Sequence, residues 1–288
     1  MSNVSSKPKS KSSTSPKAPV SATPAATPDT PAPGVPASHV AGTRGTRVTW
    51  GPLAAILVTA LSMAGAYLAA GLAAYLLPRI FHLSHSQAEA WFSSIFGQFV
   101  FIVIAESVIV AIIIRYLKTR RSSIRALGFH RKPQLKDASY VLITFGLYFV
   151  AVALVTTLAK MLLHVDLDQK QELGFDSVIN ARDMVLTFAS LVIIPPIVEE
   201  FLFRGFLFGG LRTKLPFGWA TVVTSILFAS LHLTEGSGGA LWVAGIDTFI
   251  LSLFLCYVRE KTGNLWAGIL LHACKNTVAF LYLYVVVR

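Results

Sequence analysis

Charged residues are scarce in this chain, which excludes an ordinary soluble globular protein. Only 14% of the 288 residues are Asp, Glu, Lys or Arg, whereas 54% are hydrophobic. A typical soluble domain carries about 25% charged residues. The apolar residues also form runs close to the roughly 20 residues that a membrane-spanning helix needs. The composition therefore predicts a polytopic membrane protein.

Acidic residues are fewer than basic ones. The chain has 14 Asp and Glu against 25 Lys and Arg, which gives a formal net charge of +11. In a soluble chain this balance would suggest binding to nucleic acid. Here the basic residues gather near the N-terminus and in short loops between apolar runs. Basic residues in such loops orient the spans of membrane proteins. We therefore expect a lipid bilayer as partner and no nucleic acid.

Cysteine is also scarce, and the first residues do not have the pattern expected of a secretory leader. The two cysteines, Cys256 and Cys274, lie in apolar runs, so a disulfide framework is not indicated. Residues 1–48 contain almost no large apolar residue and lack the apolar core of a signal peptide. Because they are rich in Ser, Pro, Ala, Thr and Lys, we predict a disordered cytoplasmic tail over 1–48 and a membrane domain over 49–288.

Seven apolar segments predict the helices of this membrane domain. They cover about 52–77, 92–116, 138–164, 184–211, 216–233, 239–258 and 264–287. The first is rich in small residues, which suits close helix packing rather than chemistry. The loop at 117–137 is strongly basic and that at 165–183 is acidic, so we place the first in the cytoplasm and the second outside. We predict an all-α polytopic membrane helix bundle of about seven transmembrane helices, with a cytoplasmic N-terminus.

One apolar segment contains a charged cluster. Two adjacent carboxylates, Glu199 and Glu200, and the guanidinium of Arg204 lie within the run 184–211. A charge in hydrocarbon costs roughly 2.5–3.5 kcal/mol, so three of them need a functional reason. On a helix Glu200 and Arg204 share a face and can pair. Glu199 points about 100° away, which leaves it available to a site.

Other features of the spans leave alternatives open. Pro195-Pro196 directly precedes the carboxylates and should break or kink the helix; this either helps to shape a polar cavity or is an ordinary proline kink. Asp247 and Lys275 are expected to form a structural ion pair, because an intramembrane charge usually finds a partner. Glu106 could line a substrate path, although nothing in the sequence selects that role.

Three further polar residues lie in later apolar segments: His232, His272 and Asn276. A lone intramembrane histidine is as often a hydrogen-bond partner as a catalytic group. With Glu199, however, the set provides a base, two imidazoles and an amide donor, which suits water activation and oxyanion stabilisation. A carboxylate with two imidazoles equally suits a zinc site with an open position. The His-Glu-x-x-His signature is absent, so spacing alone does not establish a metal.

Three motifs in order on successive segments carry a resemblance to a known family. They are Glu199-Glu200-x-x-x-Arg204, Phe228-x-x-x-His232 and His272-x-x-x-Asn276, supported by Phe203-Arg204-Gly205 and by Gly263-Asn264-Leu265-Trp266. The chain resembles the CPBP family of intramembrane proteases, which includes CAAX prenyl endopeptidases and bacteriocin-processing and immunity proteins. The resemblance covers about 184–276 and predicts a protease core at about 184–288. Members often carry an eighth helix, so a count of seven or eight spans stays open.

The resemblance implies a hydrolytic mechanism. In it Glu199 would activate the attacking water with the help of His232, while His272 and Asn276 would bind the developing oxyanion. Two more residues would brace the site: Glu200 and Arg204. The family has been described as metalloproteases, with zinc on Glu199, His232 and His272, and also as metal-free glutamate-dependent enzymes; both mechanisms stay open.

The expected function is therefore that of an intramembrane endopeptidase. It would hydrolyse a peptide bond in a membrane-associated or lipidated peptide or protein. We expect the chain to be an integral protein of a bacterial plasma membrane. The alternative is a non-enzymatic immunity or scaffolding protein that uses the same fold.

Overall fold

The structure is a computed structural model that describes residues 47–164, 175, 178, 180–233 and 240–286. These residues fall within one compact unit, Ser38–Arg288. Nearly all of the predicted tail and most of the acidic loop at 165–183 lie outside the described residues. Every regular element in the described part of the chain is helical, which confirms the all-α prediction.

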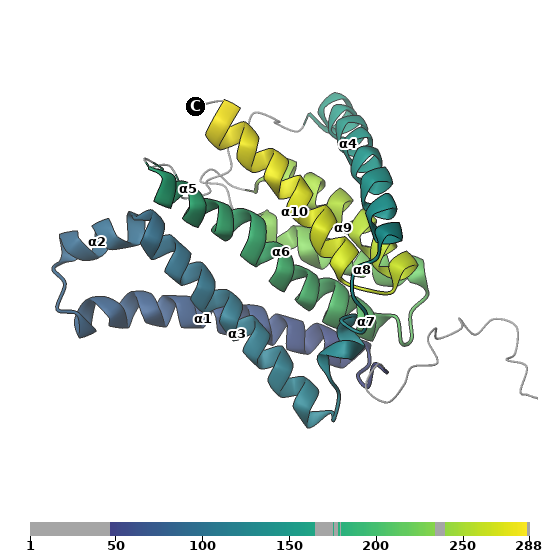
Figure 1. Ribbon diagram of the computed structural model, residues 1–288, viewed down its shortest axis with the longest axis horizontal. Coiled ribbons are helices and arrows are strands. Elements are labelled where there is room, and N and C mark those ends of the chain that lie inside the picture. The colour runs from purple at the N-terminus through teal and green to yellow at the C-terminus, as the bar shows by residue number, and fades with distance from the viewer. Residues whose placement is uncertain (1–46, 165–174, 176–177, 179, 234–239, 287–288) are drawn as a thin grey trace, which may run out of the picture. The chain divides into compact units, whose positions relative to one another are not determined.

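Long helices make up most of the described part of the unit (Figure 1). The helices outside the motif segment are α1 (Pro52–Ile80), α2 (His85–Ser93), α3 (Ile95–Thr119), α4 (Leu135–Leu163), α8 (Phe217–His232), α9 (Trp242–Thr262) and α10 (Trp266–Leu281). A 3₁₀ turn covers Ile124–Leu127, and a π-helical turn, Tyr282–Val286, extends α10.

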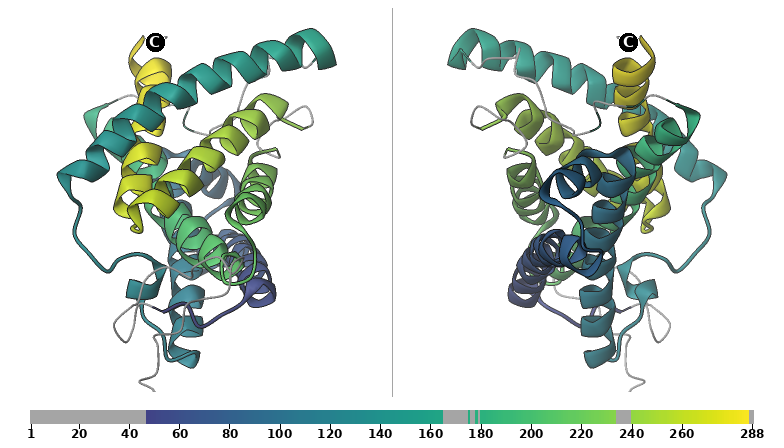
Figure 2. Two further views of the ribbon diagram at one scale, coloured as in Figure 1. Left: turned by 90° about the vertical axis from the view of Figure 1, so that its right-hand side faces the viewer. Right: turned by 90° about the vertical axis from the view of Figure 1, so that its left-hand side faces the viewer.

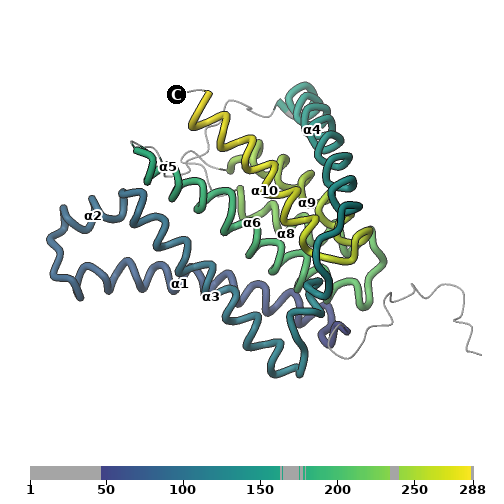
Figure 3. The backbone as a smooth tube through the Cα atoms, in the orientation of Figure 1, coloured from purple at the N-terminus to yellow at the C-terminus, as the bar shows by residue number. Residues whose placement is uncertain are grey.

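The motif segment forms one helix from Ala181 to Leu211, here called the central helix. It consists of α5 (Ala181–Phe188), a π-helical turn (Ala189–Ile193), α6 (Ile194–Glu199), a longer π-helical stretch (Glu200–Leu207) and α7 (Phe208–Leu211). The backbone follows one continuous helical path through all five pieces (Figure 3). The predicted break at the two prolines is therefore wrong. The helix continues because it widens into π turns on both sides of them, which accommodates residues that lack an N–H.

Six helices are long and apolar enough to cross a membrane among the described residues: Pro52–Ile80, Ile95–Thr119, Leu135–Leu162, Ala181–Leu211, Trp242–Thr262 and Trp266–Val286. The protein is thus an integral membrane protein. The fifth expected span, 216–233, forms α8, whose 16 residues are about 24 Å long. That is shorter than the roughly 30 Å hydrocarbon core. The prediction of seven spans becomes six long helices and one shorter apolar helix.

Local signals fix several helix ends. Pro52 occupies the first turn of α1, where its missing N–H costs nothing. Ser84 forms a capping box with Gln87 at the start of α2, and Ser94 accepts a hydrogen bond from the Gly97 amide at the start of α3. Gly263 ends α9 in the left-handed conformation, with φ of +67°.

The central helix lies between two groups of helices. Its α5 and α6 parts contact α3, and its α6 part also contacts α10 on the other side (Figure 1). The π-helical stretch Glu200–Leu207 contacts α1, α3, α8, α9 and α10, and all eight of its residues are buried. Side views show α4 at the outer edge, where it packs on α9 and α10 (Figure 2). The fold therefore places the charged motif at the centre of the bundle.

Candidate active site

The ion pair predicted within the motif is confirmed. Arg204 Nη1 donates to Glu200 Oε1 at 2.9 Å, and both side chains have 0% exposure. The guanidinium also lies over the ring of Phe228, with its central carbon 4.4 Å from the ring centroid. A desolvated cation over an aromatic face gains roughly 2 kcal/mol. Glu200 is therefore a fixed charge inside the bundle, compensated by an equally fixed cation.

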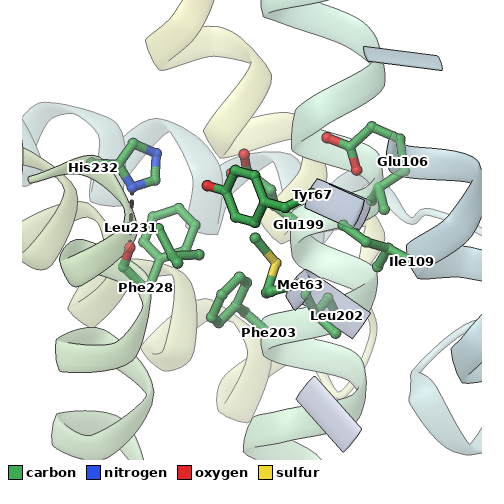
Figure 4. Close-up of a pocket in the computed structure, with 11 residues that line it drawn as sticks. Met63, Tyr67, Glu106, Ile109, Glu199, Leu202, Phe203, Phe228, Leu231 and His232 are labelled. Carbon is green, nitrogen blue, oxygen red and sulfur yellow. Dashed lines mark hydrogen bonds between the residues drawn. The ribbon is translucent and has the colours of Figure 1, made fainter. Parts of the chain in front are cut away.

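Glu199 faces a cavity instead. Its side chain retains 25% exposure, and it lines a cavity of about 130 Å³ (Figure 4). The wall comes from α1, α3, the central helix and α8. Its residues are Met63, Tyr67, Glu106, Ile109, Val198, Glu199, Leu202, Phe203, Phe228, Leu231 and His232. Water occupies roughly 30 Å³ per molecule, so the cavity has room for a few waters beside the carboxylate.

His272 lies between the two carboxylates. Its Nδ1 is 3.2 Å from Glu200 Oε1, and its Nε2 is 3.7 Å from Glu199 Oε2. The imidazole is almost fully buried, with 4% exposure. It does not form part of the cavity wall. The imidazole thus links the locked carboxylate to the one that faces the cavity and holds them in a fixed relation.

His232 lies on the cavity wall together with Glu199. Its Nδ1 is 3.0 Å from the backbone oxygen of Phe228. A carbonyl oxygen only accepts hydrogen bonds, so Nδ1 carries the proton of the neutral ring and Nε2 is an acceptor. Figure 4 shows the imidazole on the opposite side of the cavity from Glu106. The structure therefore places the carboxylate of Glu199 and the imidazole of His232 on one small cavity.

Asn276 lies one turn beyond His272 on α10, away from the cavity wall. Its side-chain Nδ2 donates to the backbone oxygen of Leu191 at 2.8 Å. The structure thus brings Glu199 together with His232 at the cavity and with His272 by direct contact, whereas the amide of Asn276 contacts the central helix. The role of His272 and Asn276 as oxyanion donors stays a prediction.

The sequence analysis missed the contribution of α1. Met63 and Tyr67 reach the cavity from this helix, which also packs closely on α3, where a Cβ on Gly65 would come within 2.9 Å of Ile112. Glu106, whose role the sequence left open, is part of the wall, and its buried Oε2 has no hydrogen-bond partner. The signal that could have found Tyr67 is a phenol in a span otherwise rich in small apolar residues.

A second group of charges lies outside the cavity. The predicted pair between Asp247 and Lys275 is confirmed, with Nζ 2.9 Å from Oδ2. Tyr148 donates a short hydrogen bond to the other carboxylate oxygen of Asp247. This network joins α4, α9 and α10, which supports the structural interpretation.

The predicted zinc ligands do not gather in this arrangement. In the part of the chain that the structure describes, no three His, Cys, Asp or Glu side chains are grouped closely enough to hold a metal ion. With Nδ1 of His272 against Glu200 and Nδ1 of His232 against the Phe228 carbonyl, only the Nε2 atoms would be available as ligands, and they do not converge with Glu199 on one point in the described part of the chain. Glu199, His232 and His272 therefore do not fit a common metal as they are placed here.

Comparisons with known proteins agree with the motifs. Residues 181–278 match the family model described as type II CAAX prenyl endopeptidase Rce1-like. The match contains all three motifs and confirms the resemblance stated from them. It supports a function of the type that CAAX intramembrane proteases have.

One curated relative is an uncharacterized 24.3 kDa protein from Escherichia coli, which is 29% identical over 104 residues. The aligned residues are 35% of this chain and 45% of the relative, so they span less than half of the relative's length. No solved structure matches the chain.

Proposed function

We propose that the chain is an intramembrane endopeptidase in which Glu199 activates the water that attacks a peptide carbonyl. The observation that carries the proposal is the division of the two adjacent carboxylates. Glu200 is locked to Arg204, whereas Glu199 faces the cavity that His232 also lines. A base for hydrolysis needs contact with water and a fixed position, and the cavity and the His272 contact supply these two conditions.

The proposed reaction begins when Glu199 accepts one proton of a cavity water. The water oxygen then bonds to the peptide carbonyl carbon, and the carbonyl oxygen becomes an oxyanion. Nε2 of His232 orients the water as a second acceptor. When the carbon–nitrogen bond breaks, the proton held by Glu199 passes to the leaving amine, and the carboxylate is restored. Buried Glu200, Arg204 and His272 hold Glu199 in place throughout.

A lipidated peptide is the substrate class that we propose. The matched family is described by its action on CAAX prenyl substrates. Glu199 belongs to the central helix, which helps to line the cavity and is long and apolar enough to cross a membrane. A substrate with a lipid anchor would reach such a cavity from the membrane and would be concentrated there.

The test uses the purified full chain and a farnesylated peptide that ends in a CAAX sequence, with fragments identified by mass spectrometry. Cleavage by the wild-type protein is expected. Glu199→Gln keeps the size of the side chain but removes its basicity, so turnover should fall by roughly 10² to 10⁴. Glu260→Gln is the matched control, because Glu260 pairs with Arg212 and lies outside the cavity. Full activity of Glu199→Gln would overturn the proposal, and so would a wild-type protein that cleaves neither this probe nor any co-expressed membrane peptide.

A further inference from the structure

Each turnover of the proposed reaction creates a cation inside the cavity. Breaking the carbon–nitrogen bond gives a carboxylic acid on one fragment and an amine on the other. The amine takes up the proton of the acid, since free amino termini are mostly ammonium ions at neutral pH. A cation within a membrane bundle is costly unless an anion compensates it. A cavity that carries out this reaction is therefore expected to offer the new amino terminus a negative group.

Glu106 is a carboxyl group on the cavity wall to which the proposed reaction gives no task. It comes from α3, and Figure 4 shows its carboxyl end directed toward the side on which Glu199 lies. Its Oε2 is buried and has no hydrogen-bond partner among the described residues. The described part of the wall contains no lysine or arginine that could pair with it. Because a buried acceptor without a partner costs free energy, this arrangement indicates a ligand that donates hydrogen bonds.

The two carboxyl groups of the wall determine the charge of that ligand. Glu106 and Glu199 line one cavity of about 130 Å³, so an anion placed between them would be repelled by both. An ammonium group would be attracted by both, and it has three N–H donors. An opposite charge within about 4–6 Å also favours the ionised form of a carboxyl group, so the ammonium itself keeps Glu106 negative. The wall therefore suits a primary ammonium group.

The order of the groups along the cavity places the leaving nitrogen near Glu106. Figure 4 shows Glu106 and His232 on opposite sides of the cavity. In the proposed reaction Glu199 and His232 hold the attacking water, which puts the water toward the His232 side. The leaving nitrogen receives its proton from Glu199, so it too must come within hydrogen-bond reach of that carboxylate. On the other side of the base, Glu106 and Ile109 of α3 form the wall, and a nitrogen there would lie between the two carboxyl groups.

We propose that Glu106 is a binding residue that accepts hydrogen bonds from the new amino terminus of the released peptide fragment. The proposal rests on the proposed function and gives the cavity a subsite for an ammonium group on the leaving side of the cleaved bond. A lysine side chain of a substrate has the same chemistry. The amino terminus is the occupant that we choose, because it forms at this cavity in every turnover, whatever the sequence of the substrate.

The test measures binding of the fragment to the purified full chain by calorimetry. The ligand is the tripeptide that follows the farnesylated cysteine in the probe peptide, with its amino terminus either free or acetylated. A hydrogen-bonded charge pair corresponds to about 10- to 100-fold in affinity. Glu106→Gln should raise the Kd of the free tripeptide by about that factor and leave the Kd of the acetylated one unchanged. Glu260→Gln, outside the cavity, should bind both as the wild type does.

A further variant and ligand separate this role from a structural one. Glu106→Asp keeps the charge and should retain part of the preference for the free tripeptide. Equal affinities of the wild type for the two tripeptides would overturn the proposal, and so would tighter binding of an acetylated tripeptide that carries a lysine. If Glu106→Gln binds the free tripeptide as Glu260→Gln does while Glu199→Gln has lost cleavage, the proposal is wrong and the proposed function stands. Cleavage by Glu199→Gln at the wild-type rate would instead contradict the proposed function.

Discussion

The side-chain amide of Asn276 supplies the hydrogen bond that the central helix cannot give to Leu191. Its Nδ2 donates to the Leu191 carbonyl oxygen at 2.8 Å. In an α-helix that carbonyl would accept from residue 195, and in a π turn from residue 196. Both residues are prolines and have no N–H. The tandem prolines therefore free this carbonyl, and α10 docks on the central helix through it.

Asn276→Ala should destabilise the protein for this reason. A carbonyl left without a partner in a nonaqueous setting costs about 1–3 kcal/mol. We expect a lower unfolding midpoint in detergent for the single variant. Pro195→Ala in the same chain gives the helix back an N–H four residues after Leu191 and should recover part of the loss. Unchanged stability in Asn276→Ala would show that water or another group satisfies the carbonyl.

The same double variant also shows what Asn276 does for turnover. If Pro195→Ala restores stability but turnover stays low, the amide acts on the reaction, as the family resemblance implies. If both recover, Asn276 is a positioning residue that holds α10 and His272 against the central helix. The assay is cleavage of the probe peptide, normalised to folded protein.

Gly268 should be required for the contact between α10 and the ion pair. A Cβ at this position would lie 2.8 Å from Glu200 Oε2, too close for any ordinary contact. Gly268→Ala should therefore displace Glu200 or α10, and with it His272. A displacement of about 1 Å at a catalytic group can cost about 10²-fold in rate. Gly146→Ala on α4 is the control, because a Cβ there meets nothing within 4 Å. Equal turnover in the two variants would contradict this prediction.

Arg204→Leu should be severely destabilising, because it leaves the carboxylate of Glu200 buried without its cation. The expected loss is on the order of 3–5 kcal/mol in the free energy of unfolding. Adding Glu200→Gln removes the unpaired charge and should recover part of the stability. Arg212→Leu removes a more exposed pair with Glu260 and should cost less than about 1 kcal/mol. Wild-type stability of Arg204→Leu in a thermal melt would contradict the burial of the pair.

Local spacing was enough to predict some of this site. Glu200 and Arg204 are four residues apart on one helix, so their contact follows from helix geometry alone. The pair of Asp247 with Lys275 followed from the cost of an unpaired charge in a membrane. The position of His272 between both carboxylates did not follow, because His272 lies 72 residues after Glu200 on another helix, α10, and its approach depends on how the two helices pack.

Other parts of the site depend on packing between distant segments. Tyr67 and Glu106 are more than 90 residues before Glu199 in the chain, and no periodicity within α1 or α3 identifies their shared cavity. The fifth segment, 216–233, was predicted within a residue or two of the bounds of α8, but hydrophobicity alone does not show that 16 residues are too few to cross a bilayer. Sequence patterns thus predicted the elements, whereas the cavity required the arrangement of the helices.

The orientation in the membrane can be tested with fused reporters. The loop that follows α3 is strongly basic, and its 3₁₀ turn ends at Leu127. A reporter active only in the cytoplasm should therefore be active when fused after Arg125. It should be silent when inserted near Asp168, which lies outside the described residues. The reverse pattern would overturn the assignment of a cytoplasmic N-terminus.

Removal of metal is the last test, and it distinguishes the two mechanisms that the family resemblance leaves open. In the described part of the chain, no three His, Cys, Asp or Glu side chains are grouped closely enough to hold an ion. His272 has its two nitrogens against Glu200 and Glu199, and His232 has Nδ1 against the Phe228 carbonyl. A ligand set for zinc would need at least three donors directed at one point. We therefore predict that a chelator leaves the turnover of the purified protein unchanged, and that added zinc does not raise it.

The variant His272→Gln makes this prediction sharper. If His272 links the carboxylates by hydrogen bonds, glutamine retains a donor and should keep part of the activity, with no change in zinc content by elemental analysis. If His272 is a zinc ligand, the variant should lose both activity and bound zinc together. Chelator inhibition that zinc alone reverses would establish the metal mechanism. It would also mean that Glu199 and the Nε2 atoms of His232 and His272 come closer together when the ion binds than they are in this structure.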